Sequence, residues 1–526
     1  MHLAVPLALA FLAFAAFATR RTLTYLRIFQ QEEYDSRRFL RWLVRTRAID
    51  TRASIGVLIA FAVSFASLPA AWAAMAQLMV LAIALAVVAL LEPDPLKTGK
   101  KKLALTARAT RILFLAVGLS LVVAAAVAWL VPSILAWLIP VHFVPLSLAL
   151  ATLLLAPSER HVQAKYWCEA EAILQRIKPV VIGITGSYGK TSTKHLLAHI
   201  LSVQAPTLAT PGSVNTAMGI ARIVRERLEA RHRWFVVEMG AYGRGSIATL
   251  CRLTPPRLGI LTTIGKAHYE RFGSVDEVAV AKLELAEASE RNGGRVVFGA
   301  GAMRHPTVRS WAEAHKPMVE AIGILETAET PEGLAIAVDW QGARHDLKVP
   351  IHGMQQVDNI VLAFAAACSL GVPPSVAAQA LASAPQIQHR LEVKTLANGA
   401  VLIDDAYNSN PEGFAAGLRL LDLLRKPGGR RILVTPGMVE LGAIEETEHE
   451  AIGRLAGGLV DVLLAVSPDR IEALTKAYTA ANPQGLVVPC ATFADADRWM
   501  AANLQPSDVV LLENDLPDLY ELKLRL

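Results

Sequence analysis

The first 156 residues alternate long apolar runs with short, strongly basic stretches. Four runs contain no charged residue: 3–18, 54–91, 112–131 and 134–156. A helix needs about 20 residues to cross a bilayer, so the run at 54–91 can cross twice and fold back at Leu68-Pro69. The stretches 20–52 and 97–111 are rich in arginine and lysine, which keeps such loops on the cytoplasmic side. The pattern predicts a transmembrane domain over 1–156, with five helices, the N-terminus outside and the remaining chain in the cytosol.

Two points about this region stay open. Positive charge at Arg20 and Arg21 follows the first run instead of preceding it, which favours a retained anchor over a cleaved secretory signal. One pair of runs could alternatively form a hairpin that enters the bilayer without crossing it. Residues 157–178 are predicted to form an amphipathic linker helix. Its apolar positions either lie on the bilayer surface or pack on the next domain: Trp167, Ile173, Leu174 and Ile177.

Beyond Pro179 the pattern changes to short β-branched or apolar runs that alternate with helical patterns. The first runs of strand length are 180–184, 234–239, 258–263 and 295–298. This alternation predicts an α/β domain with a parallel sheet over 179–388. The rhythm restarts near 389, with strand patterns at 401–404, 431–434, 462–466, 486–488 and 509–512. It predicts a Rossmann-like domain over 389–526, and without a G-x-G-x-x-G motif no dinucleotide is implied.

Composition agrees with a membrane domain joined to soluble domains. The chain is 53% hydrophobic with a mean hydropathy of +0.38, and the apolar excess lies in the first 156 residues. The four cysteines lie far apart without C-x-x-C spacing, which argues against a zinc site and a disulfide framework. The net charge of +6 is modest and gathers beside the apolar runs. It therefore indicates membrane topology and not nucleic-acid binding.

The strand pattern that begins at Val180 leads directly into a glycine-rich turn and then a helical pattern. The turn reads Thr185-Gly-Ser-Tyr-Gly-Lys-Thr191, with Ile184 at the first glycine position of the general G-x-x-x-x-G-K-[ST] form. Glycines let backbone N–H groups converge on an anion, and the helix N-terminus adds partial positive charge. Lys190 is expected to reach the terminal phosphates, and the Thr191 hydroxyl to ligate Mg²⁺. The stretch predicts a mononucleotide site.

Three more polar groups follow predicted strands of the same domain. They are Glu238, the pair Thr262-Thr263, and His268. Ligands bind at the carboxyl ends of the strands in open parallel sheets, so these groups are candidates for the same site. Taken singly, Glu238 could cap a backbone group and His268 could be an interior histidine. Lys282 alone would be a surface lysine, and Asp404-Asp405 a polar turn.

These motifs together resemble the Mur ligase family, the ATP-dependent amide ligases of cell-wall precursor synthesis. The resemblance covers 179–526, and two stretches, Asp404–Pro411 and Gly437–Gly442, are most similar to the D-alanyl-D-alanine-adding branch. Further matching motifs stand in family order: Pro211-Gly-Ser-Val-Asn215, Glu238-Met-Gly240, Ile264–Gly273, Ala281-Lys-Leu-Glu284, Asn359 and His389-Arg-Leu391.

The resemblance implies a reaction and a role for each residue. A carboxylate attacks the γ-phosphate of ATP to give an acyl phosphate, and an amine then displaces phosphate, with two Mg²⁺ ions neutralising the charge. The implied metal ligands are Thr191, Glu238, His268 and Lys282, the last matching a lysine that is carbamylated in many members. The implied catalytic set is Lys190, Glu238, His268 and Lys282. The implied nucleotide contacts are Thr185, Gly186, Ser187, Gly189, Lys190, Thr191, Ser192, Asn215, Asn359 (near the adenine), Arg390 and Asp405. The amine substrate is implied at Tyr407, Asn408 and Asn410.

The chain departs from the family at several places. Membrane helices stand where the adding enzyme has a small soluble domain for its UDP-sugar peptide. The family's G-[RK]-H-N-x-x-N reads Gly353-Met-Gln-Gln-Val-Asp-Asn359, and its G-N-x-N-N reads Gly212-Ser-Val-Asn-Thr216. Residues 512–518 are acidic where a Lys-Gly-Ser-type turn is expected. These changes predict retained chemistry with altered substrate handling.

Three functions are therefore considered. The first is an inner-membrane, multi-pass, ATP-dependent carboxylate–amine ligase with its catalytic domains in the cytoplasm, which acts on peptidoglycan precursors. The second keeps this chemistry but acts on a lipid-linked or polymeric envelope substrate. The third is a non-catalytic ATP-binding scaffold, which would not need to retain the residues for a second metal ion. The expected partners are ATP, Mg²⁺, the carboxylate and amine precursors, the bilayer and other envelope-synthesis proteins, without nucleic acid.

Overall fold

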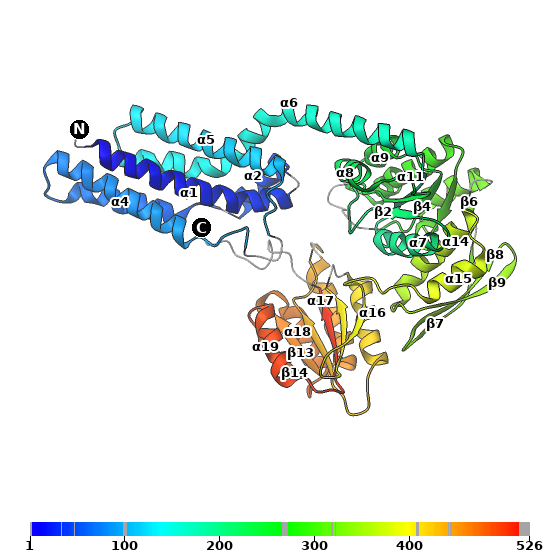
Figure 1. Cartoon of the computed structure of the whole chain (residues 1–526). Coiled ribbons are helices and arrows are strands. Elements are labelled where there is room, and N and C mark those ends of the chain that lie inside the picture. Colours follow the sequence, from blue (N-terminus) through cyan, green and yellow to red (C-terminus); the bar gives the residue numbers. More distant parts are fainter. Residues whose placement is uncertain are drawn as a thin grey trace. The chain divides into compact units, whose positions relative to one another are not determined.

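The chain forms two compact units, one within residues 1–163 and one within 164–515. The computed structural model (Figure 1) describes residues 3–32, 34–46, 48–97, 102–265, 272–316, 319–320, 322–406, 410–439, 441 and 444–514. The α/β fold class with an N-terminal helical region is confirmed.

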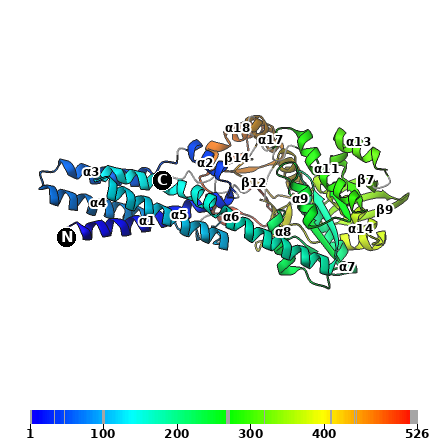
Figure 2. The same cartoon turned by 90° about the horizontal axis from the view of Figure 1, so that it is seen from above.

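The first unit is helical throughout the part that is described. Its elements are α1 (Ala4–Gln31), α2 (Ser36–Arg45), α3 (Thr51–Ala62), η1 (Val63–Phe65), α4 (Ala70–Leu91), α5 (Ala107–Leu130), η2 (Ile134–Trp137) and α6 (Leu138–Ile177). Figure 2 shows α1, α3, α4 and α5 lying lengthwise beside one another. Aromatic side chains of α1 fill the core of this bundle, where Phe14 contacts Trp137 edge to face.

Four described helices are long and apolar enough to cross a membrane: α1, α4, α5, and the segment Ile134–Ile177 that contains α6. The segment Thr51–Phe65 is shorter but also apolar. Large apolar side chains point outward, with Leu90 81% and Trp129 84% exposed. The chain leaves the helical conformation at the predicted turn, Leu68-Pro69, and again at Pro132-Ser133, between the uncharged runs 112–131 and 134–156. Membrane crossing itself stays a prediction.

Helix α1 continues well past the basic pair that was expected to end the first apolar run. Arg21 is 3% exposed, and its guanidinium lies 2.8 Å from an Asp50 carboxylate oxygen and 3.1 Å from one of Glu92. Two carboxylates from later in the chain thus neutralise a cation that could otherwise not be buried. Arginine is a good helix former, so the basic pair does not end the helix, and the two carboxylates make the burial of Arg21 possible.

Helix α6 is one continuous element, although residues 157–178 were expected to form a separate linker. Pro145 and Pro157 both lie inside it. A proline removes one backbone hydrogen bond, and apolar packing on both sides of Pro157 keeps the helix whole. Its last turns answer the question that the sequence left open. Trp167, Ile173, Leu174 and Ile177, which themselves belong to the second unit, pack in its apolar core.

The second unit begins with a six-stranded parallel sheet in the order β2-β3-β1-β4-β5-β6. The strands are β1 (Val180–Thr185), β2 (Thr207–Ala209), β3 (Trp234–Glu238), β4 (Leu258–Leu261), β5 (Arg295–Phe298) and β6 (Val319–Glu320). The register pairs Ile184 with Glu238 and Thr185 with Leu261. The carboxyl ends of the three central strands therefore meet at one edge of the sheet.

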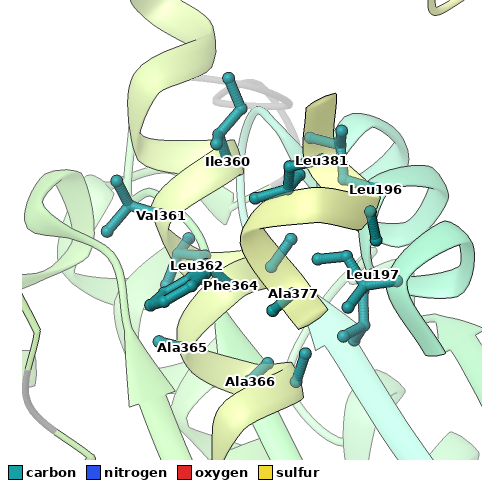
Figure 3. Close-up of a cluster of buried hydrophobic side chains, with 14 of the residues drawn as sticks. Leu196, Leu197, Ile360, Val361, Leu362, Phe364, Ala365, Ala366, Ala377 and Leu381 are labelled. Carbon is teal, nitrogen blue, oxygen red and sulfur yellow. The ribbon is translucent and has the colours of Figure 1, made fainter. Parts of the chain in front are cut away.

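Helices cover both faces of this sheet. They are α7 (Lys190–Gln204), α8 (Ala217–Arg227), α9 (Ser246–Leu253), α11 (Val275–Arg291), α12 (Ala300–Met303), α13 (Pro306–Ala314), α14 (Val357–Ser369) and α15 (Pro374–Ala382). Figure 3 shows how Leu196 and Leu197 of α7 meet Phe364 of α14 and Leu381 of α15. The opposite face packs on α8, α9, α11 and the end of α6. The site-bearing end of α7 is thus anchored by a large apolar core.

Three antiparallel strands, which the sequence pattern did not reveal, lie between α13 and α14. They are β7 (Gly323–Thr330), β8 (Gly333–Trp340) and β9 (Ala343–Val349), followed by η4 (Met354–Gln356). β8 buries most of its side chains, whereas β7 is largely exposed.

The last domain is a second six-stranded sheet in the order β10-β11-β15-β12-β13-β14. Its strands are β10 (Glu392–Thr395), β11 (Val401–Asp405), β12 (Arg431–Thr435), β13 (Val462–Val466), β14 (Leu486–Cys490) and β15 (Val509–Glu513). Its helices are α16 (Pro411–Leu423), α17 (Glu445–Leu459), η6 (Pro468–Arg470), α18 (Glu472–Ala481) and α19 (Phe493–Asn503). The five strand patterns predicted after 389 are confirmed, and the antiparallel β10 adds an edge strand.

Candidate functional site

The glycine-rich turn joins the end of β1 to the start of α7 and is packed tightly. Gly189 has φ +83°, and a Cβ placed on it would lie 2.1 Å from the Asn359 side-chain oxygen. A Cβ on Gly186 would meet the Thr262 hydroxyl at 1.9 Å. Only glycine fits either position, because the loop is pressed between the end of β4 and the start of α14.

Side chains at the end of β4 fasten this turn. The Thr262 hydroxyl donates to the Tyr188 carbonyl over 2.5 Å, and the Ser187 hydroxyl donates to the Gly265 carbonyl over 3.1 Å. The Thr185 hydroxyl donates to the Met239 carbonyl beside β3, and Ser192 is buried in the first turn of α7. The loop therefore has a fixed shape before any ligand binds.

Lys190 curls back over the turn. Its Nζ donates to the Gly186 carbonyl over 2.8 Å and to the Ser187 carbonyl over 3.4 Å. Burial lowers the pKa of Lys190, and the Glu238 carboxylate partly offsets this effect. The ammonium group thus lies over the turn in which the backbone N–H groups of an anion site would converge.

Glu238 ends β3 and is the centre of a buried polar cluster. Its side chain is 1% exposed. One carboxylate oxygen accepts hydrogen bonds from the Thr191 hydroxyl and from Lys194 Nζ, both over 3.0 Å. The other oxygen accepts from Asn215 Nδ2 over 3.3 Å. Three predicted site residues from separate elements are therefore brought together.

Lys194 is the residue that sequence reasoning missed. It is fully buried, pairs with Glu238, and also donates to the Gly212 carbonyl. Burial lowers the pKa of Lys194, while the Glu238 carboxylate opposes that change. Its spacing from Lys190 was the available signal, because residues four apart share a helix face.

Lys282 lies on α11 and is 4% exposed, so its interpretation as a surface lysine is wrong. Burial, together with the positive charge of Lys190, lowers the pKa of Lys282 well below the usual range. A neutral amine is the form of lysine that reacts with carbon dioxide, so this environment suits the implied carbamate. His268, Tyr407 and Asn408 lie outside the described residues, and their roles stay predictions.

Asn359 lies against the phosphate-loop turn and is held by neighbours. Its Oδ1 accepts from the Thr193 hydroxyl over 3.3 Å, and its Nδ2 donates to the Gln356 side-chain oxygen over 2.8 Å. Gln356 stands where the family motif has its first asparagine. It thus orients Asn359, the asparagine of the motif that is retained. A contact of Asn359 with adenine stays a prediction.

The remaining predicted residues belong to the C-terminal domain. Asp405 ends β11 and accepts a hydrogen bond from the Leu391 N–H over 3.2 Å. Burial raises the pKa of Asp405 to about 7, and the Arg390 guanidinium partly offsets this effect. Asn410 caps α16, where its Oδ1 accepts from the Gly413 N–H over 2.9 Å. Its predicted substrate contact is untested.

A second group of possible metal ligands in this domain already has a cation. The atoms of His389, Glu392 and Asp404 lie within 4.8 Å of one another. Lys394 Nζ lies 2.8 Å from Glu392 and 3.2 Å from Asp404. The lysine neutralises the two carboxylates, so this cluster gives no reason to expect a metal.

Comparisons with known proteins agree with this geometry. The sequence profile of the Mur ligase middle domain matches residues 184–367, and that of the Mur ligase glutamate ligase domain matches 389–513. The UDP-N-acetylmuramoyl-tripeptide–D-alanyl-D-alanine ligase of Mycobacterium tuberculosis (strain H37Rv) is 33% identical over 361 residues, which cover 63% of this chain and 70% of that protein. The chain belongs to the Mur ligase family. It is accordingly an ATP-dependent ligase that forms a C–N bond.

This Mur ligase is also similar to a second UDP-N-acetylmuramoyl-tripeptide–D-alanyl-D-alanine ligase and to two solved structures named MurF. The corresponding ligase of Bacillus subtilis (strain 168) is 30% identical over 311 residues, which cover 58% of this chain and 64% of that protein. A crystal structure of MurF from Acinetobacter baumannii superposes with a TM-score of 0.59 at 25% identity, and covers 67% of this chain and 77% of that one. MurF from Thermotoga maritima in complex with ADP shares the fold, with a TM-score of 0.56 at 24% identity, and covers 67% and 80%.

The residues of this Mur ligase fit the ATP and Mg²⁺ that the family uses. Thr191 and Glu238 present hydroxyl and carboxylate oxygens 3.0 Å apart, and Mg²⁺ prefers such oxygen ligands. Asn215 Nδ2 donates to the other carboxylate oxygen of Glu238 and so orients the group. The glycine turn and Lys190 fit a phosphate chain.

Replacing Gly189 of the Mur ligase with alanine should damage the phosphate loop. The new Cβ would overlap the Asn359 side chain, and alanine disfavours the positive φ. We expect ATP affinity to fall by about tenfold or more, and the free energy of unfolding by about 1–3 kcal/mol. Calorimetric titration and urea unfolding measure the two effects. Gly458→Ala, at an exposed helix position without neighbours within 4 Å, is the matched control. Unchanged ATP affinity in Gly189→Ala would contradict the tight packing of this loop.

Replacing Asp405 of the Mur ligase with asparagine should flatten the pH dependence of stability. Because its pKa in the folded state is about 7, the native protein holds a proton that the unfolded chain loses near pH 4. The stability that Asp405 contributes is full below about pH 4 and is lost as the pH rises to about 7. At pH 8 we expect the free energy of unfolding of Asp405→Asn to be on the order of 2–4 kcal/mol higher than that of the wild type. Asp497→Asn, at an exposed position, should leave the profile unchanged.

Proposed function

We propose that this ligase joins an amine such as D-alanyl-D-alanine to a carboxylate of a peptidoglycan precursor. The observation that carries the proposal is the buried Glu238 cluster, where Thr191 and Asn215 converge on one carboxylate beside the phosphate turn. The matched relatives are named for this reaction, and the chain covers 70% of the first of them. A scaffold that only bound nucleotide would not also need the buried Lys282 of the implied second metal site.

The proposed reaction has two steps, and each residue of the site has a role in it. The substrate carboxylate attacks the γ-phosphorus of ATP, ADP leaves, and an acyl phosphate forms. The amine nitrogen then attacks the acyl carbon, and inorganic phosphate and a proton leave as the amide forms. Lys190 and the turn amides would bind the transferred phosphate, and Glu238 and Thr191 would hold a Mg²⁺ ion that could neutralise charge between the two anions. Carbamylated Lys282, together with His268, would hold a second ion.

The chain's helical unit supports a membrane location, with the ligase domains in the cytoplasm. Its long helices are apolar and expose large side chains such as Trp129. The two family profiles begin only at residue 184, so they leave this unit unmatched. This favours a second candidate function, in which the same chemistry acts on a lipid-linked or polymeric envelope substrate. Retention in the membrane pellet after carbonate washing tests the location separately.

One experiment tests the substrate. Full-length protein in detergent is supplied with ATP, Mg²⁺ and pairs drawn from soluble UDP-linked precursors, lipid-linked precursors and D-amino-acid or dipeptide amines. We expect ADP and phosphate to be released only when both an acid and an amine are present, with the amide detected by mass spectrometry. A protein that binds ATP but forms no acyl phosphate with any precursor would refute the ligase proposal. Amide formation with lipid-linked acids alone would select the second candidate.

A further inference from the structure

A cavity of about 180 Å³ in the helical unit is not used by the ligase chemistry. It lies between the first turns of α5 and the middle of α6. Its apolar lining is Ile112, Leu155 and Ala156, and its polar lining is Arg108, Thr152, Glu159, Arg160 and Gln163. Two guanidinium groups thus border a partly apolar space.

The positive charge of this cavity is not cancelled by its one carboxylate. Glu159 is bound by Arg111, whose Nε donates to it over 2.7 Å. Arg108 stacks on the Tyr34 ring with its guanidinium carbon 4.4 Å from the centroid, and its buried Nε has no hydrogen-bond partner among the described residues. Arg160 is exposed and forms no ion pair within the described part of the chain. The cavity therefore carries excess positive charge.

The cavity lies where both helices change from apolar to charged. In α5, Arg111 is the last charged residue before the uncharged run 112–131. In α6, the uncharged run 134–156 ends shortly before Glu159 and Arg160. If the helices cross a bilayer, this level is the boundary between acyl chains and headgroups. Basic pockets between helices at this level suit acidic headgroups.

We propose that this cavity binds the phosphate of an anionic membrane lipid. Arg108 and Arg160 would hold the phosphate, and the acyl chains would continue along the exposed apolar surface beyond Ile112 and Leu155. Both helices carry exposed apolar side chains in their uncharged runs, with Phe114 of α5 72% and Leu153 of α6 70% exposed. A free phosphate would use only the guanidinium groups, so the apolar lining favours a lipid. The proposal rests on the membrane insertion proposed above.

Native mass spectrometry of the full-length protein in neutral detergent tests this proposal. The probes are phosphatidylglycerol, the net-neutral phosphatidylcholine, and inorganic phosphate. We expect phosphatidylglycerol to bind selectively, and the double variant Arg108→Gln/Arg160→Gln to bind it about tenfold more weakly or worse. The matched control is Arg45→Gln/Arg52→Gln, which removes equal charge from exposed positions outside the cavity.

A second variant tests the cavity itself without changing its charge. Ala156→Leu fills the cavity but leaves both arginines, and it should also weaken phosphatidylglycerol binding. Equal binding of the two lipids, full binding by both cavity variants, or displacement of lipid by millimolar phosphate would each overturn the proposal. Carbonate-washed membranes keep the failures apart. Loss of the wild type from the pellet refutes membrane insertion, whereas a retained protein without selective binding refutes only the lipid site.

Discussion

Glu238→Gln should abolish turnover and at the same time destabilise the fold. Glutamine keeps the shape of the side chain but removes the charge that Thr191 and Lys194 surround. Without the carboxylate a Mg²⁺ ligand is lost, and we expect kcat to fall by about 1,000-fold or more. Lys194 would also be left as an unpaired buried cation, which should lower the free energy of unfolding by about 3–5 kcal/mol. Coupled ADP release and urea denaturation measure the two effects.

A double variant separates the two losses. Glu238→Gln/Lys194→Met removes both charges and puts an apolar side chain of similar length in the buried position. Replacing a buried ion pair with apolar groups is often neutral, so most of the stability should return while turnover stays absent. If the double variant unfolds as easily as Glu238→Gln, the ion pair does not explain the loss. If it regains turnover, Glu238 does not serve the metal.

Lys282→Met should remove activity without destabilising the protein. Its amine is a polar group that is almost fully buried, so an apolar replacement removes the cost of keeping it away from water. Because the carbamate would be lost with it, we expect kcat to fall by about 100-fold or more, with an unchanged or higher free energy of unfolding. ADP release and thermal unfolding check the two parts. Lys476→Met, at an exposed position of α18, should change neither.

Carbon dioxide gives a further check on Lys282. Wild-type protein prepared in CO₂-depleted buffer should lose turnover and regain it when bicarbonate is added, while Lys282→Met should respond to neither treatment. A strong activity loss combined with a clear fall in stability would instead give Lys282 a packing role. Wild-type turnover that is indifferent to bicarbonate depletion would argue against the carbamate.

The contiguous parts of the site could be predicted from the sequence, because their geometry is local. The strand, turn and helix around Thr185–Thr191 are adjacent in the chain, and the parallel sheet brings Glu238 to the same edge. Burial was harder to predict. Lys282 and Lys194 are polar residues on helices, and their burial depends on which segments pack over them.

Long-range compensation explains the other differences. Arg21 can be buried because Asp50 and Glu92 reach it from elsewhere in the chain. Pro157 does not end α6, because both sides of it are packed. The strands β7–β9 gave no pattern signal because β7 has little burial to impose one. For Arg21 and Pro157 the deciding contacts are distant in sequence.

The ammonium group of Lys194 gives the nucleotide site a resident counter-ion. Since this lysine already pairs with Glu238, the buried carboxylate has a counter-ion before any divalent ion arrives. A magnesium-starved cell would then hold an idle enzyme and not an unfolded one, ready to resume synthesis as soon as the ion returns.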